Sequence, residues 1–355
     1  MKNIIMNKNF NKEIKKYVKK QKVNGLCDVD IKKKNMCRNS RVASQFKDLE
    51  NLGNKNLQYS NTVKYLKERP YYLPETIPFK KHDMEKLKKN FNSDTKKWIV
   101  KPENSLNRNG IGVFESYNKL VKFVSKYNYN EWIIQEFIDN PLLIDGKKFH
   151  FRVYVLIIKD KKMFKTLMYN RGFLYFSTKK YNSNNEEAYL TDGKTKSQVK
   201  VFPQFYNKYY DNFDETIVPQ LKIIVNDTIE SVYKNLECVN NSKCYKYLGY
   251  DILIDRFYRC YLAEINTNLI GFPHTPFNFK NRFYSSILDA VLKNKTENFV
   301  FINRFEHKSK KIKIINETIT ETTPTGFTSL NKYLIIFILI VIIICFVCLL
   351  NYFNF

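Results

Sequence analysis

A carboxylate and an amide stand two positions apart in the segment YLAEINTN, residues 261–268. If this segment is a strand, Glu264 and Asn266 project from the same face. Asp251 interrupts the apolar pattern of the preceding strand in the same way. If the two strands pair, three oxygen ligands converge, a set that suits Mg²⁺ bridging nucleotide phosphates. For Glu264 alone, the alternative is a solvated sheet face that carries an incidental acid.

Two cations share one face of another predicted strand, KKFHFRVY. Lys148 and Arg152 occupy alternate positions there, together with His150. Two cations are costly to bury without an anion, so one interpretation is a clamp for the phosphates of ATP. The other is an exposed strand face.

A third group lies further upstream. Lys101 stands near the end of an apolar strand, and a polar loop with Gly110 and Gly112 follows it. Glycines without a Cβ let backbone N–H groups approach phosphates closely. The signal is weak by itself, because surface loops often contain two glycines.

The elements that must position these residues mix strands and helices without regular βαβ alternation. Helical spacing of apolar residues predicts helices at 117–128 and 214–237, and Pro219 marks a candidate start of the second. Predicted strands cover 96–102, 131–138, 150–160 and 162–170, and two more flank a tight turn near 256–258. This pattern predicts an α+β fold with antiparallel sheets.

Composition divides the chain into five parts. We expect a basic, poorly ordered arm (1–45), an N-terminal subdomain (46–95), a core (96–299), a linker (300–332) and a C-terminal transmembrane helix (333–355). The 18 residues Tyr333–Leu350 carry no charge, and as a helix they would rise about 27 Å, close to the hydrocarbon thickness. A buried core helix is the alternative.

The formal charge of +26 favours an anionic partner: nucleic acid, an acidic protein tail or a membrane surface. A composition bias toward Lys, Asn, Ile and Tyr explains the same excess. The seven cysteines match no zinc spacing, and we predict free thiols in a reducing compartment. No pattern resembles a nucleic-acid-binding motif.

Several motifs occur together in one order: WIVKP, NGIGV, IIQEFIDNPLLIDGKKFHFRVYVLI, GFLYFST, YLTDGKTK, YLGYDILID and YLAEIN. This set, over about residues 46–290, resembles the tubulin–tyrosine ligase-like family. The resemblance implies the ATP-grasp fold, ATP and Mg²⁺ as cofactors, and ligation of a free amino acid to carboxylates of tubulin or another protein with an acidic tail.

The resemblance also implies roles for individual residues. Asp251, Glu264 and Asn266 would bind magnesium, and Lys148, Arg152 and Glu264 would serve catalysis. The nucleotide would meet the following residues: Lys101, Gly110, Gly112, Gln135, Glu136, Phe137, Ile138, Lys148, Thr191 and Asp192.

Three positions depart from the family pattern. Relatives usually carry Asp in place of His150, Asn in place of Asp192 and Arg near Tyr175. These positions fall where the donor amino acid and the acceptor would bind, so the identity of the substrate stays open.

The sequence thus predicts a ligase anchored to a membrane by its C-terminal tail, with the catalytic domain facing the cytosol. It would add glutamate, or else tyrosine or glycine, to a protein carboxylate through an acylphosphate, with tubulin as the preferred acceptor. The alternative is a catalytically inactive, membrane-anchored module that binds tubulin or microtubules.

Overall fold

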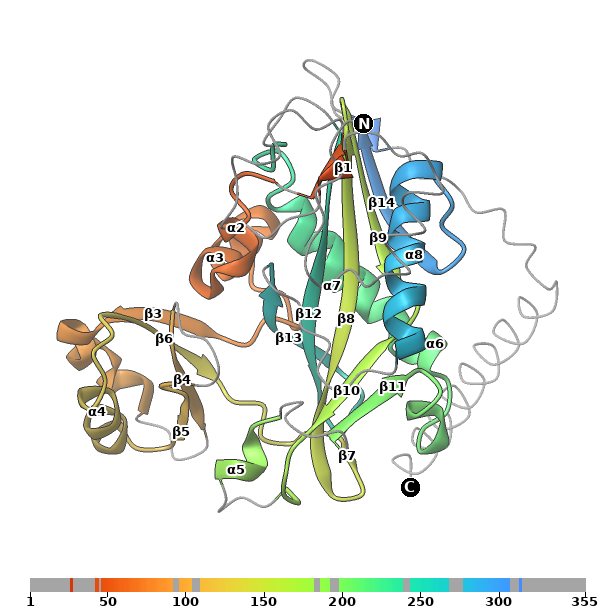
Figure 1. The fold of residues 1–355 in the computed structure, drawn as a ribbon. Helices are drawn as coiled ribbons and strands as arrows, with labels where there is room; N and C mark the ends of the chain where they lie inside the picture. Colours follow the sequence, from red (N-terminus) through yellow and green to blue (C-terminus); the bar gives the residue numbers. More distant parts are fainter. Residues whose placement is uncertain are drawn as a thin grey trace, which may run out of the picture. The chain divides into compact units, whose positions relative to one another are not determined.

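The structure is a computed structural model that describes residues 26–27, 42–44, 46–91, 96–103, 109–181, 186–191, 198–238, 243–267, 277–306 and 313–314. These residues all lie in the compact unit Met1–Ile315. They form two sheets that are joined by helices and loops (Figure 1). The predicted α+β class with largely antiparallel sheets is confirmed.

Within the described residues, the larger sheet has eleven strands and the smaller has four. The larger sheet contains β1 (Leu26–Cys27), β2 (Val42–Ala43), β7 (Leu143–Ile144), β8 (Lys147–Asp160), β9 (Met163–Tyr169), β10 (Gly172–Phe176), β11 (Val199–Phe202), β12 (Lys243–Ile254), β13 (Cys260–Asn266), β14 (Phe299–Glu306) and β15 (Lys313–Ile314). The smaller sheet has the order β3 (Thr76–Lys80), β6 (Glu131–Glu136), β4 (Trp98–Pro102) and β5 (Gly112–Phe114).

The α-helices in the same ranges are α2 (Glu50–Gly53), α3 (Lys55–Leu66), α4 (Tyr117–Ser125), α5 (Glu186–Tyr189), α6 (Phe213–Thr216), α7 (Val218–Glu230) and α8 (Phe277–Lys293). Two 3₁₀ segments, η2 (Lys81–Phe91) and η4 (Tyr206–Lys208), complete them. Helix α7 begins where expected, because Pro219 lies in its first turn, where a missing N–H costs nothing.

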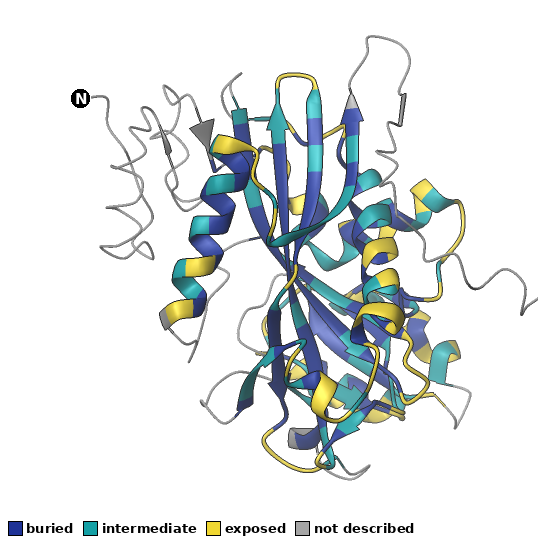
Figure 2. Cartoon of the chain, turned by 90° about the vertical axis from the view of Figure 1, so that its right-hand side faces the viewer, coloured by how far each residue is buried: buried dark blue, intermediate teal, exposed yellow. Residues whose placement is uncertain are grey.

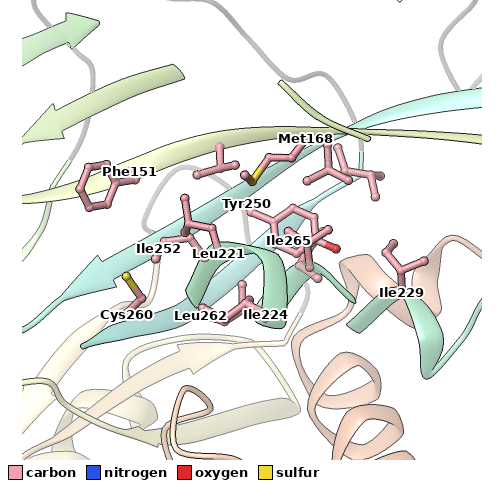
Figure 3. Close-up of a cluster of buried hydrophobic side chains, with 14 of the residues drawn as sticks. Phe151, Met168, Leu221, Ile224, Ile229, Tyr250, Ile252, Cys260, Leu262 and Ile265 are labelled. Carbon is pink, nitrogen blue, oxygen red and sulfur yellow. The ribbon is translucent and has the colours of Figure 1, made fainter. Parts of the chain in front are cut away.

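Strand β8 is the central strand of the larger sheet, and its two faces belong to two different cores. The odd-numbered residues Phe149–Ile157 join the core under α7, whereas Tyr154, Leu156 and Ile158 join the core under α8. Successive side chains of a strand point to opposite faces, so one fourteen-residue strand serves both. Figure 3 shows side chains of α7 packed against those of β12 and β13.

The strands are more deeply buried than the helices. Figure 2 shows the strands buried along most of their length, while the helices keep exposed positions toward solvent. Complete burial of one large apolar side chain stabilises the folded state by about 1.5–3 kcal/mol. The central strands are therefore the rigid frame to which the candidate site residues are attached.

The smaller sheet includes a strand, β3, in a segment that carries two prolines, YYLPETIPF at residues 71–79. Strand β3 pairs with β6 and lies at the edge of its sheet. Pro78 is tolerated there because an edge strand leaves one row of backbone groups unpaired. Together with α4 and η2, this sheet encloses its own apolar core around Trp98 and Trp132.

Three further predictions concern the linker, the other domain boundaries and the C-terminal anchor. The linker is predicted from residue 300, but residues 300–306 belong to β14, which pairs with β9. The other domain boundaries remain predictions. The predicted anchor 333–355 lies outside the described residues, and no helix in the described ranges is long and apolar enough to span a membrane.

The prediction that all cysteines are free is wrong for two of them. Cys238 and Cys244 form a disulfide, with Cα atoms 5.6 Å apart. Their spacing of six residues carries no signal by itself. Cys238 forms an isolated β-bridge with Phe46, and Cys244 lies at the start of β12. The folded chain brings these two segments together. Cys260 is free and buried.

Candidate active site

The three predicted metal ligands meet at the paired strands β12 and β13. Asp251 lies directly opposite Glu264, and Asn266 lies opposite Gly249. The Asn266 Nδ2 atom is 3.1 Å from Asp251 Oδ2 and 3.2 Å from Glu264 Oε1. The antiparallel register therefore brings two carboxylates and an amide to one point. Rotating the amide by 180° would present its oxygen instead, completing a set of hard oxygen donors.

Arg152 reaches this point from the neighbouring strand β8, where it is paired with Asp251. Its guanidinium makes a two-point contact with that carboxylate, through Nε to Oδ1 and through Nη2 to Oδ2 at 2.8 Å. Burial works to raise the pKa of Asp251, but the charge of Arg152 outweighs it and holds that pKa well below its usual range. Asp251 is therefore an anion at neutral pH.

Two buried lysines lie near the same cluster. Lys101, on β4, donates from Nζ to Gln135 Oε1 at 2.9 Å, and Lys148, on β8, has its Nζ 4.3 Å from the centre of the Phe137 ring. Burial lowers the pKa of Lys101 to about 8. Burial, reinforced by repulsion from Lys101, lowers the pKa of Lys148 to about 7. No carboxylate of the described residues forms an ion pair with Lys148.

Lys55 is a site residue that sequence reasoning missed. It begins helix α3, and its Nζ lies 3.7 Å from Glu264 Oε2 with only 13% of the side chain exposed. Its charge also acts on the pKa of Lys101. The one local signal is Asn54, whose side chain caps α3 and so fixes where the helix begins. Nothing in the sequence indicates that this helix end faces β13.

The balance of charge at this cluster is positive. Four side chains that can carry a positive charge gather around two carboxylates, so the cluster would hold a surplus of two positive charges if all four were protonated (4 − 2 = 2). The residues are Lys55, Lys101, Lys148, Arg152, Asp251 and Glu264. Buried cations without partners are unstable unless an anion joins them, and the depressed lysine pKa values reflect this. The donor set thus fits a polyphosphate with a divalent cation between it and the carboxylates.

Two of the three residues that depart from the family pattern, His150 and Tyr175, lie together next to Arg152. His150 Nδ1 is 2.5 Å from Thr191 Oγ1, and His150 Nε2 is 3.5 Å from Asp251 Oδ1. The Tyr175 ring lies 5.2 Å from the His150 ring and 5.3 Å from the Arg152 guanidinium carbon. Asp192, the third departure, lies outside the described residues.

The two predicted loop glycines have a packing role. Gly110 has a φ of +77°, and a Cβ there would lie 2.6 Å from Pro102 Cγ. A Cβ on Gly112 would lie 2.7 Å from Phe114 Cζ. Gly110 requires glycine because of its positive φ, and a side chain at Gly112 would displace the Phe114 ring, so contact with phosphates remains a prediction. Residues 104–108, between Pro102 and Gly110, lie outside the described ranges.

The predicted nucleotide-binding residues 135–138 lie at the end of β6 and directly after it. The N–H of Glu136 donates to the carbonyl of Glu75, and the N–H of Phe137 donates to that of Lys97. These bonds fix the path of the chain before Ile138, and they use two backbone donors that a base could otherwise have met. Gln135 instead contributes its side chain, which holds Lys101.

No group of three His, Cys, Asp or Glu residues in the described ranges is arranged to hold a metal ion. The cluster on β12 and β13 has two carboxylates, and its third member is an amide. A site completed by phosphate oxygens and water needs no third acidic residue.

The excess of basic side chains beside a hairpin of oxygen donors is suited to an anionic, phosphate-bearing ligand accompanied by a cation. The chain belongs to the tubulin-tyrosine ligase family, whose model matches residues 32–308. The antiparallel α+β architecture is consistent with the ATP-grasp fold expected of that family.

Among similar proteins, tubulin glycylase 3C of Tetrahymena thermophila is 28% identical over 245 residues, 62% of this chain and 22% of that protein. Tubulin polyglutamylase TTLL7 of Homo sapiens is 25% identical over 285 residues, 68% of this chain and 31% of that protein. The probable alpha-tubulin polyglutamylase Ttll1 of T. thermophila is 27% identical over 207 residues, 48% of each chain. The chain thus spans less than a third of the first two proteins and about half of the third.

Proposed function

We propose that this protein is an ATP- and Mg²⁺-dependent ligase that joins a free amino acid to a carboxylate of tubulin. The observation that carries the proposal is the excess of basic side chains, Lys55, Lys101, Lys148 and Arg152, beside the carboxylates of β12 and β13. Membership of the tubulin-tyrosine ligase family supports it.

The chain's own residues would act mainly by charge and position. Asp251, Glu264 and Asn266 would hold Mg²⁺, while Lys101 and Lys148 would hold phosphate oxygens. Bound ATP would supply the γ-phosphoryl group that activates the acceptor carboxylate as an acylphosphate with release of ADP, and attack by the donor amine would then release phosphate. The residues of the site would fix the reacting groups, so little general-base chemistry would be required of the protein.

Arg152 has a second role in this proposal. Its two bonds to Asp251 keep that carboxylate ionised and aimed at the cation, and its guanidinium faces the ring of Tyr175. His150 and Tyr175 would therefore shape the space next to the reacting groups. We place the donor amino acid in this space and propose glutamate, with glycine as the alternative supported by the names of the glycylase relatives.

The membrane anchor is a separate proposal. The uncharged run Tyr333–Leu350 is long enough to cross the hydrocarbon core as a helix, and the interfacial residue type tyrosine stands at its start. The catalytic domain would then face the cytosol. Cell fractionation tests it: the full chain should stay with membranes after alkaline carbonate extraction, and a chain ending at residue 332 should not.

Mass spectrometry tests the ligase activity. The full chain is incubated with tubulin, ATP, Mg²⁺ and an equimolar mixture of amino acids, and Glu264→Gln serves as the inactive control. A mass gain of one residue type on tubulin, absent with the control, supports the proposal and identifies the donor. No gain, together with tubulin binding that survives Glu264→Gln, would instead establish the inactive binding module.

A further inference from the structure

The turn between β12 and β13 presents aromatic and basic side chains to solvent. Its sequence is DRFYR, residues 255–259, and the four residues after Asp255 are all exposed. Phe257 is 59% exposed, the highest value among the exposed large apolar side chains of the described ranges, and Tyr258 is 40% exposed. An isolated exposed apolar side chain is ordinary, so what distinguishes Phe257 is how it is held.

The turn is held rigidly from within. Asp255 is 3% exposed, and its Oδ1 accepts from the N–H of Phe257 at 2.9 Å and of Arg259 at 3.0 Å. Its Oδ2 accepts from Arg259 Nε at 2.8 Å and from the Tyr261 hydroxyl at 3.1 Å. One buried carboxylate therefore fixes both the backbone and one side of the turn.

Helix α7 holds the other side. Gln220 donates from Nε2 to the carbonyl of Tyr258 at 2.7 Å and accepts at Oε1 from the N–H of Cys260 at 2.9 Å. Tyr258 itself has a φ of +62°, a left-handed conformation that is strained for an aromatic residue. The surrounding bonds hold Tyr258 in this conformation and so fix the path of the backbone through the turn.

Two guanidinium groups flank the exposed ring. The guanidinium carbon of Arg256 lies 4.8 Å from the centre of Phe257, and that of Arg259 lies 5.3 Å from it. Arg259 is paired with Asp255, whereas Arg256 has no carboxylate partner among the described residues. The turn thus combines a preorganised apolar contact with an unneutralised cation. Arginine and aromatic residues are the types that dominate the energetics of protein interfaces.

The turn also lies close to the candidate active site. The turn begins at Asp255, four residues after Asp251 and directly after the end of β12, so it begins about 13 Å from Asp251. An extended polypeptide covers roughly 10–20 Å in three to six residues. A protein segment that places one carboxylate at the cluster can therefore reach Phe257.

We propose that the turn 255–259 is a docking site for the acceptor protein, which it contacts through an apolar side chain with acidic neighbours. This inference rests on the proposed function, because the acceptor is the protein whose carboxylate enters the active site. An acidic acceptor fits the free charge of Arg256 and the formal charge of +26 on the chain. Base stacking fits less well, because the ring that would receive a base already contacts two guanidinium groups.

The test is a double variant, Arg256→Ser with Phe257→Ser, in the full chain. Its matched control removes a cation and an aromatic side chain elsewhere: Lys126→Ser, at the C-terminal end of α4, with Tyr65→Ser on α3, where Tyr65 is 45% exposed. Equal thermal unfolding temperatures and equal ATP affinity show that both variants keep the fold and the nucleotide site. The dissociation constant for tubulin is measured directly, and KM and kcat for ligation are measured alongside it.

We expect the turn variant to raise the dissociation constant and KM for tubulin about tenfold with kcat unchanged, and the control to change neither. Tubulin binding that weakens in the same way without any ligation would uphold the docking site and refute the ligase. Equal tubulin affinity in the wild type and the turn variant would overturn the docking site, whatever the ligase assay shows. The docking site would also be overturned if the turn variant lost affinity only for RNA or only for anionic vesicles.

Discussion

Arg152 on β8 and Asp251 on β12 are directly paired across the larger sheet and form a two-point ion pair, with Arg152 Nη2 2.8 Å from Asp251 Oδ2. Both side chains are largely buried, at 14% and 9% exposure. The pair links the basic side chains of β8 to the oxygen cluster of the β12–β13 hairpin. Each of these two elements positions only part of the site, and the ion pair joins the two parts.

We expect Arg152→Met to lower the free energy of unfolding by about 3–5 kcal/mol, because it leaves the buried carboxylate of Asp251 without its arginine partner. Chemical denaturation of the full chain measures this. The exposed pair Lys47–Glu237, at 3.5 Å, provides the control: Lys47→Met should cost less than about 1 kcal/mol. Adding Asp251→Asn to Arg152→Met should recover part of the loss. Strict additivity would show that the two residues are not coupled.

Nucleotide affinity should depend on the protonation of Lys148, whose pKa is lowered to about 7 by burial. A bound polyphosphate favours the charged amine, so binding above this pKa takes up a proton. We expect the affinity for ATP to fall as pH rises from about 7, approaching tenfold per unit for one such group. Calorimetry in buffers of different ionisation enthalpy measures the proton uptake, and Lys148→Gln should reduce it.

The same lysine affects stability without ligand. Its folded pKa lies below the usual 10.5, so between about pH 7 and 10.5 the unfolded chain binds more protons than the folded chain. The free energy of unfolding contributed by Lys148 therefore increases with pH in this window. Unfolding of wild type and Lys148→Gln should diverge most near pH 7. Parallel curves across the window would contradict the assignment.

Lys55→Gln should weaken ATP binding about tenfold or more, because a charged hydrogen bond to a phosphate contributes about 1.5–3 kcal/mol. Lys64→Gln removes an exposed lysine from the same helix and should leave the affinity unchanged. Both variants retain Asn54, the residue that caps α3. Equal effects of the two would mean that only net charge matters, and that Lys55 has no special position.

Glu264→Gln should reduce Mg²⁺-dependent ATP turnover at least about 100-fold and raise the Mg²⁺ concentration that is required. The carboxylate is lost while the shape of the side chain is kept, so the folded state should be preserved. Glu237→Gln, at an exposed position of the same charge, is the control. Titration of Mg²⁺ at fixed ATP separates loss of the metal from loss of the nucleotide.

Local patterns were sufficient for much of the site. The i, i+2 spacing of Glu264 and Asn266, and of Lys148, His150 and Arg152, assigned each set to one face of a strand, and the register confirms both placements. Period-two spacing is a property of the strand itself, so it needs no knowledge of the rest of the fold. The strand β3, the Cys238–Cys244 disulfide and the position of Lys55 gave no comparable signal.

The sequence by itself determined the α+β class, the hairpin around DRFYR and the identity of the polar residues on each strand face. Only the tertiary structure decided which faces meet. Lys55 and Glu264 are 209 positions apart (264 − 55 = 209), yet their charged groups lie within 3.7 Å. Such contacts depend on how the helices and sheets pack together. The hydrophobic effect that drives this packing is not directional, so the pattern of apolar residues does not indicate which distant charged residue becomes a neighbour.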